Sequence, residues 1–202
     1  QSLKQSKTNK KFVYLISPNK IEDESFYANL ALVLSTKKIS FFQLRLKKET
    51  SLNKLMIGKK IKKICKKYKV KFLINDDPLL AKKLNADGCH LGQKDMDLIK
   101  ARKILKDKII GVTCHNSINL AKIAIKAGAD YLAFGAFFTS KTKIIKYRAS
   151  LRILNSVKKI TLLPIVAIGG IKLNNYKKLL LNKANFLAIS GYIWNNKKYK
   201  PL

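Results

Sequence analysis

Short apolar runs alternate along the chain with longer segments in which apolar residues recur every three or four positions. The runs are rich in β-branched and aromatic residues, as buried strands are. They span residues 12–17, 39–45, 71–76, 88–92, 109–114, 131–137, 164–170 and 185–190. The segments between them, such as 25–35, 51–68 and 116–129, have the spacing of amphipathic helices. The pattern predicts eight strands that alternate with helices.

Strict alternation of strand and helix is typical of a parallel sheet. Eight such units with no change of composition favour a closed (β/α)8 barrel over an open doubly wound sheet. A weak internal repeat agrees with this count, because NADGCHLG, GADYLAFG and KANFLAISG each place a small turn before a predicted strand. We therefore expect an α/β protein with one compact TIM barrel over residues 12–202. Residues 1–11 are polar and basic, and we expect them to form a flexible tail.

The charge balance is strongly basic and could indicate a nucleic-acid-binding protein. The chain has 43 Lys and Arg against 11 Asp and Glu, a formal net charge of +32. Clustered cations neutralise phosphates, but these lysines fall on nearly every predicted helix instead of forming one stripe. We therefore expect a solvated lysine surface and no specific nucleic-acid partner, with a nucleic-acid-binding protein as a distant alternative.

Cysteine usage and the first residues indicate a cytoplasmic protein. The three cysteines are an odd number without paired spacing, which is typical of a reducing compartment. No apolar run follows residues 1–11, so we expect neither a signal peptide nor a membrane partner. The pairs Cys89-His90 and Cys114-His115 are poor zinc sites, since neighbours on a strand point to opposite faces.

Polar residues interrupt the second predicted strand on one face. In FFQLRLK, a period of two puts Gln43, Arg45 and Lys47 together and the apolar residues on the other face. Helices cover the outside of a barrel, so we expect the polar face to point toward the mouth. An arginine and a lysine that converge on a pocket predict an anionic, phosphorylated substrate.

Scarce carboxylates follow the third and fourth predicted strands. Asn75 and Asp76 end one strand, and Asp95 comes three residues after the end of the next. Two carboxylates at one mouth are typical of a magnesium site completed by a substrate diphosphate. The alternative is helix capping: Asp76 or Asp77 before Pro78, and Asp95 before the next helix. For Asp77 we favour the cap.

Further polar residues follow the remaining strands. GVTCHN brings Thr113 and His115 to the same rim, and the loop after the sixth strand contains Ser140, Thr142 and Lys143. Glycines after the seventh and eighth strands allow backbone N–H groups to approach an anion, in the common phosphate-binding place of this architecture. The residues of this second anion site are Gly169, Gly170, Ser190 and Gly191.

Seven motifs in order resemble the thiamine phosphate synthase family over roughly residues 12–193. They are QLRLK, LINDD, ADGCHLGQKD, GVTCHN, FGAFFTSKTK, VAIGGI and AIS. The resemblance implies a transferase that condenses 4-amino-2-methyl-5-(diphosphooxymethyl)pyrimidine with 4-methyl-5-(2-phosphooxyethyl)thiazole. The products would be thiamine monophosphate and pyrophosphate, formed by Mg²⁺-assisted ionisation.

The resemblance also implies a role for individual residues. Those that would bind the pyrimidine diphosphate are Gln43, Arg45, Lys47, Asn75, Thr113 and Lys143. Those that would contact the thiazole phosphate are Ser140, Thr142, Gly170, Ile189 and Ser190. Asp76 and Asp95 would bind Mg²⁺. Arg45, Lys47 and Lys143 would be the catalytic cations that stabilise the departing pyrophosphate.

Departures from the family pattern leave alternatives open. Thr113 stands where serine is usual, Lys94 lies beside a metal aspartate, and the loop after Lys143 lacks the usual Pro and Gly-Leu-Glu features. Few residues follow Ser190, so we expect a shortened C-terminal helix and barrel closure that depends on a partner subunit, with a homo-oligomer possible. The alternatives are a thiazole tautomerase-like paralogue and a catalytically degenerate barrel.

Overall fold

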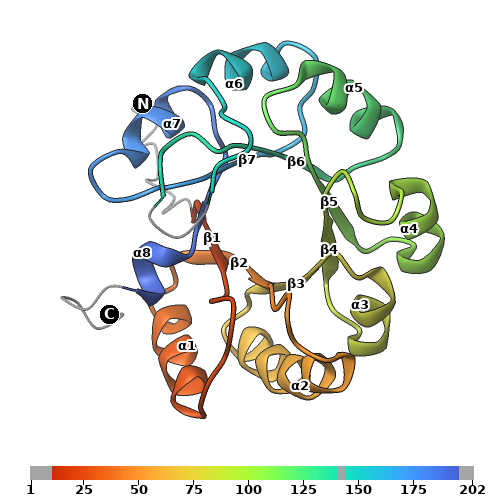
Figure 1. Ribbon diagram of the computed structural model, residues 1–202, viewed down its shortest axis with the longest axis vertical. Coiled ribbons are helices and arrows are strands. Elements are labelled where there is room, and N and C mark those ends of the chain that lie inside the picture. The colour runs from red at the N-terminus through yellow and green to blue at the C-terminus, as the bar shows by residue number, and fades with distance from the viewer. Residues whose placement is uncertain (1–10, 141–143, 196–202) are drawn as a thin grey trace, which may run out of the picture.

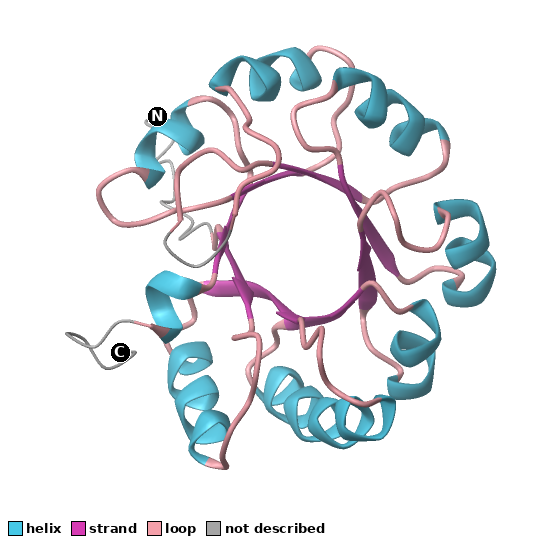
Figure 2. Cartoon of the chain, viewed as in Figure 1, coloured by secondary structure: helices cyan, strands magenta, loops and turns pink. Residues whose placement is uncertain are grey.

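The computed structural model is a closed barrel of eight parallel strands surrounded by helices, and it describes residues 11–140 and 144–195 (Figures 1 and 2). The strands are β1 (Val13–Ile16), β2 (Ile39–Leu44), β3 (Lys71–Asn75), β4 (Gly88–Leu91), β5 (Ile109–Thr113), β6 (Tyr131–Phe134), β7 (Ile165–Ile168) and β8 (Phe186–Ile189). The helices are α1 (Ser25–Ser35), α2 (Ser51–Lys67), α3 (Pro78–Leu84), α4 (Leu98–Leu105), α5 (Ile118–Lys126), α6 (Leu151–Lys158), α7 (Tyr176–Leu181) and α8 (Gly191–Trp194). The predicted TIM barrel is confirmed. Most of the expected basic tail, residues 1–10, lies outside the described residues.

The barrel closes within this chain. β8 pairs with β1 in parallel, with Leu187 opposite Val13 and Ile189 opposite Leu15. The expectation that closure depends on a partner subunit was therefore wrong, because the strands satisfy each other's backbone groups across the seam. The indole Nε1 of Trp194 in α8 donates a hydrogen bond to the carbonyl oxygen of Ile16 at 2.6 Å.

The same tryptophan joins α8 to α1. Its ring centroid lies 5.1 Å from that of Phe26, and Figure 1 shows the two helices as neighbours. α8 is a single turn, yet this turn contacts both the first strand and the first helix. Packing of a large indole thus supports the closing seam.

Two apolar layers follow from the alternation along each strand. Leu15, Phe42 and Leu187 point outward and pack under the helices. Tyr14 and Tyr131 point inward and belong to a smaller cluster inside the barrel. The inner layer fills the lower barrel and forms the floor of the cavity above it.

Helix caps separate the structural carboxylates from the others. Asp77 Oδ1 accepts a hydrogen bond from the Leu80 N–H at 2.9 Å and caps α3, as expected. α4 is capped by Asp97, so the cap alternative for Asp95 was wrong. Asp76 and Asp95 therefore remain available for another role.

Other expectations concern membranes and cysteines. Within the part of the chain that the structure describes, no helix is both long and apolar enough to span a bilayer. Cys65, Cys89 and Cys114 are buried free thiols. Cys89 packs in the outer layer whereas His90 lines the cavity, which agrees with the argument against zinc.

Candidate active site

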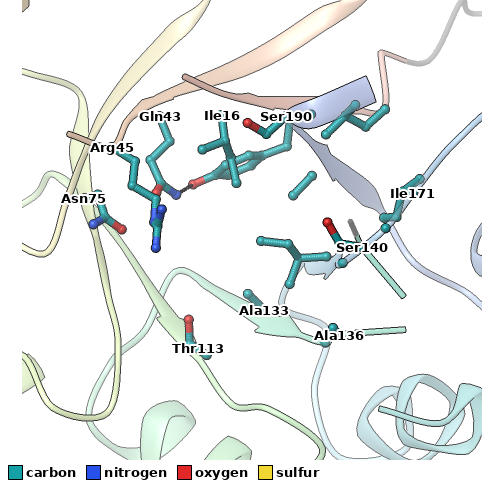
Figure 3. A pocket seen from close by; sticks show the side chains of 18 of the residues that line it. Ile16, Gln43, Arg45, Asn75, Thr113, Ala133, Ala136, Ser140, Ile171 and Ser190 are labelled. Atoms are coloured by element: carbon teal, nitrogen blue, oxygen red, sulfur yellow. Dashed lines mark hydrogen bonds between the residues drawn. The ribbon is translucent and has the colours of Figure 1, made fainter. Parts of the chain in front are cut away.

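A cavity of about 930 Å³ lies at the carboxyl-terminal mouth of the barrel. Figure 3 shows Gln43, Arg45 and Asn75 together on one side of it and Ser140 and Ile171 on the opposite side. The first side therefore presents charged and amide groups, while the other is formed by the loops after β6, β7 and β8. Active sites of TIM barrels occupy this mouth.

The predicted polar face of β2 lies at the cavity. Gln43 is only 3% exposed and points inside the barrel, and Arg45 and Lys47 line the rim above it. Arg45 Nη1 donates to Asn19 Oδ1 at 3.0 Å, and burial lowers the pKa of its guanidinium while the charge of Asp76 raises it. The alternation of polar and apolar residues thus predicted the correct direction for these side chains.

Asp76 and Asp95 lie together at this rim. Asp76 adopts a left-handed backbone conformation with φ of 65°, and its N–H donates to the His90 carbonyl oxygen at 2.8 Å. Asp95 Oδ2 accepts a hydrogen bond from the Gly92 N–H at 2.7 Å. Burial raises the pKa of the Asp95 carboxyl, and its side-chain hydrogen bond with Asp76 raises it further. Two carboxyl groups this close favour a shared proton or a cation.

The donor set of this pair fits a magnesium ion. Carboxylate oxygens are the ligands that Mg²⁺ prefers, and it often takes only one or two from the protein. The described residues contain no cluster of three or more His, Cys, Asp or Glu side chains, so two carboxylates would leave positions for substrate oxygens and water. Lys47 Nζ lies 3.3 Å from Asp76 Oδ2, which places a cation beside the same site.

A chain of buried hydrogen bonds crosses the barrel below the cavity. Gln43 Nε2 lies 2.8 Å from Tyr14 Oη, which lies 2.7 Å from Tyr131 Oη. Tyr131 Oη lies 2.8 Å from His90 Nδ1, and His90 Nε2 lies 2.7 Å from Thr113 Oγ1. Two predicted substrate-binding residues, Gln43 and Thr113, are therefore the ends of one network.

The three residues in the middle of this hydrogen-bond network were not identified from the sequence. His90 was considered only as a zinc ligand, and the tyrosines only as strand formers. A signal was available, because Tyr14 and Tyr131 occupy inward positions of predicted strands, and a buried phenol needs a hydrogen-bond partner. Lys172 and Tyr147, which also line the cavity, carried no such signal.

The far rim is made by the loops after β6, β7 and β8. Ser140, Gly170, Ile189 and Ser190 line the cavity as predicted, whereas Thr142 and Lys143 lie outside the described residues. Gly170 has a φ of 61°, a conformation that favours glycine. A Cβ there would lie 2.4 Å from the Thr139 carbonyl oxygen, so the two loops meet only because this side chain is absent.

His115 lies at the rim after β5. Its ring stacks on that of Tyr147 with centroids 3.8 Å apart, and both residues line the cavity. Burial lowers the pKa of His115. The stack connects the loop after β5 with the loop that follows β6.

Burial of His90 makes stability depend on pH. Burial lowers its pKa to about 4, whereas the unfolded chain takes up a proton near 6.5. The unfolded state therefore binds more protons below pH 6.5, and the free energy of unfolding falls as the pH decreases from 6.5 to 4. We expect this histidine to account for about 3 kcal/mol of that loss, since one pKa unit corresponds to about 1.4 kcal/mol.

Urea denaturation at a series of pH values, in metal-free buffer, measures this dependence. His90→Gln should lose that part of it, and the difference between variant and wild type should grow as the pH falls from 6.5 to 4. Equal pH slopes in the two proteins would contradict the burial of a neutral imidazole.

Comparisons with known proteins agree with this geometry. The profile of the thiamine monophosphate synthase family matches residues 13–193. A thiamine-phosphate synthase of Pelagibacter ubique is 86% identical, with 99% of this chain and 97% of the relative covered. One from Nitrosomonas eutropha is 40% identical, with 91% and 86% covered.

A solved structure is similar over nearly the same length. Thiamine phosphate pyrophosphorylase from Pyrococcus furiosus superposes with a TM-score of 0.80 at 28% identity, covering 94% of this chain and 90% of that one. The similarity therefore extends over nearly the whole chain.

Proposed function

Since the chain belongs to the thiamine monophosphate synthase family and is a transferase that makes thiamine phosphate, we propose a division of that task among its residues. The pyrimidine diphosphate lies on the β2 to β5 side of the cavity. Its proposed ligands on that side are Gln43, Arg45, Lys47, Asn75 and Thr113, and Lys143 is a further proposed ligand of the diphosphate. The thiazole phosphate lies on the other side, against Ser140, Gly170, Ile189 and Ser190. Thr142 is a further proposed ligand of this phosphate.

One observation supports this proposal above the others: two carboxylates and two cations meet at one rim. Lys47 Nζ lies 3.3 Å from Asp76 Oδ2, Arg45 and Asp95 line the same cavity, and burial together with the nearby Asp76 raises the pKa of Asp95. A pyrophosphate needs cations around its oxygens, and carboxylates beside it would repel it unless a metal ion lay between. We therefore assign Asp76 and Asp95 to Mg²⁺.

Cleavage of the carbon–oxygen bond leaves a pyrimidine-stabilised carbocation and pyrophosphate in this proposal. Negative charge grows on the leaving group, and the positive charges of Arg45, Lys47 and Lys143 stabilise it. In other enzymes, removal of one such contact raises the activation barrier by roughly 3–4 kcal/mol. Bound Mg²⁺ would add positive charge at the same oxygens.

The thiazole nitrogen then forms the new carbon–nitrogen bond by donating its lone pair to the cation. No general base is needed for this step, because the attacking nitrogen carries no proton. The chain has to hold the two substrates face to face and exclude water from the cation. The stack of His115 on Tyr147 closes one part of the rim between the two proposed subsites.

Incubation with both substrates tests the proposal directly. With the pyrimidine diphosphate, the thiazole phosphate and Mg²⁺, we expect equal amounts of thiamine monophosphate and pyrophosphate. Chelation of the metal by EDTA should stop the reaction, and added Mg²⁺ should restore it. Product formation at the same rate in EDTA would contradict the assignment of Asp76 and Asp95 to a metal. Absence of product in Mg²⁺ would instead favour a degenerate barrel.

A further inference from the structure

The buried chain of hydrogen bonds from Gln43 to Thr113 has one order of donors and acceptors, and that order determines which substrate the site selects. We propose that Tyr14, Tyr131 and His90 are positioning residues that fix Gln43 as an acceptor and Thr113 as a donor toward the cavity. The site then selects a 4-amino pyrimidine diphosphate against its 4-oxo analogue. This inference rests on the proposed function, because it needs the pyrimidine to lie against Gln43 and Thr113.

The direction follows from counting protons along the chain. Gln43 Nε2 donates to Tyr14 Oη, so among the described residues the partner left for the Tyr14 proton is Tyr131 Oη, 2.7 Å away. If Tyr131 donated to Tyr14 instead, the Tyr14 proton would be buried without an acceptor. A buried donor without an acceptor is strongly unfavourable. Tyr14 is therefore the donor to Tyr131.

The same argument continues to the other end. Within residues 11–140 and 144–195, the acceptor left for the proton of Tyr131 is then His90 Nδ1, at 2.8 Å. A neutral imidazole has one N–H, so it must be on Nε2, where it is donated to Thr113 Oγ1 at 2.7 Å. The Thr113 oxygen thus receives a hydrogen bond from below, and its own proton is free to point to a ligand.

Both ends of the chain face the cavity with opposite character. Gln43 and Thr113 line the cavity, and the amide nitrogen of Gln43 is held by Tyr14. The amide oxygen of Gln43 is therefore the group presented as an acceptor. A 4-aminopyrimidine offers an N–H₂ donor to the Gln43 oxygen and ring-nitrogen acceptors to the Thr113 hydroxyl. A 4-oxo ring offers an oxygen acceptor in place of the N–H₂ group, so it would meet the Gln43 oxygen with the wrong polarity.

Burial and ring packing hold the side chains of this hydrogen-bond chain in place. Tyr14 is 1% and Tyr131 3% exposed, and their rings pack edge to face with centroids 5.8 Å apart. His90 stacks on Tyr131 at 5.7 Å. A Cβ at Gly111, the neighbour of Tyr131 on β5, would lie 1.9 Å from the phenol ring, so glycine at this position makes room for the chain.

The tautomer of His90 tests the direction without any substrate. The chain has two histidines, so the ring signals of ¹⁵N-labelled protein can be assigned by their loss in His90→Gln. In long-range ¹H–¹⁵N correlation spectra of the wild type at pH 7.5, we expect the His90 proton on Nε2 and an unprotonated Nδ1. A proton on Nδ1 would reverse the donor and acceptor order of the hydrogen bonds and overturn the inference.

Substrate discrimination tests the consequence. Wild type should prefer the 4-amino over the 4-oxo pyrimidine diphosphate by at least about 10³-fold in kcat/KM, because sites built to bind polar groups reject mismatched ones strongly. Tyr131→Phe leaves the Tyr14 proton without an acceptor unless the Gln43 amide turns over and accepts it. That rotation would present N–H₂ to the cavity, so the preference should fall by about 100-fold.

Tyr176→Phe is the matched control, since it removes the same hydroxyl from a ring that stacks on Phe12 in the outer layer. It should keep the wild-type preference. A folded Tyr131→Phe protein that also keeps it would overturn the inference, as would a wild type that accepts both substrates equally. Failure of wild type to make thiamine phosphate would contradict the proposed function instead, and the His90 tautomer can be measured in either case.

Discussion

Asp76→Asn is expected to lower kcat by at least about 10³-fold while the protein remains folded. The substitution removes one of two carboxylates assigned to Mg²⁺, and about 4 kcal/mol of barrier stabilisation corresponds to this factor. Folding should survive for two reasons. Asparagine tolerates the φ of 65° at this position, and the variant no longer holds two acidic groups in contact. Product formation at saturating substrate, over a range of Mg²⁺ concentrations, measures the loss.

The neighbouring residue provides a control with the same chemical change. Asp77 caps α3 through the Leu80 N–H, and asparagine is an equally good cap. Asp77→Asn should therefore keep both the thermal midpoint and the turnover close to those of wild type. Similar losses in the two variants would show that charge at this loop, and not a metal ligand, is responsible. An Asp76→Asn protein within tenfold of wild type would refute the metal assignment.

Arg45→Ala is expected to lower kcat/KM for the pyrimidine diphosphate by about 10²–10³-fold. The guanidinium lines the cavity, and a planar fork binds phosphate oxygens at two points and stabilises charge as it develops. Its side chain bonds only to Asn19 among the described residues, so we expect a change of less than about 1 kcal/mol in the free energy of unfolding. Steady-state kinetics with the diphosphate varied, beside thermal melts, separate the two effects.

Arg45→Lys distinguishes charge from shape. Lysine keeps the positive charge but loses the planar fork, so it should recover about tenfold of the loss seen in the alanine variant. A variant that loses stability but keeps its kcat/KM would show that Arg45 supports the rim and does not bind the substrate. Full recovery by lysine would show that charge alone matters at this position.

The fold was predictable because its signal is repeated eight times. Each buried strand of a barrel has to be apolar outward, and each helix has to be apolar on one face, so period and order were enough. The β2 residues were predictable for a related reason. A parallel barrel strand has no solvent-exposed face, and polar residues such as Gln43 and Arg45 must therefore point to the mouth.

The buried chain and the closing seam were harder to predict. The partner of Tyr14 is Tyr131, 117 residues away, and a period of two does not show which inward residues meet. The role of Trp194 in barrel closure was missed because the C-terminal helix was expected to be too short to support the seam. Its stabilising contacts come from one large side chain and do not depend on the length of the helix. Local patterns predict direction well, but pairing across the barrel depends on register.

The position of Trp194 has an experimental consequence. It is the chain's one tryptophan, it lines the cavity, and its indole N–H is already held by the Ile16 carbonyl oxygen. Intrinsic fluorescence therefore comes largely from a reporter at the junction between the first and last strands. A change in emission on adding one substrate at a time would record occupancy of this side of the mouth, without any label.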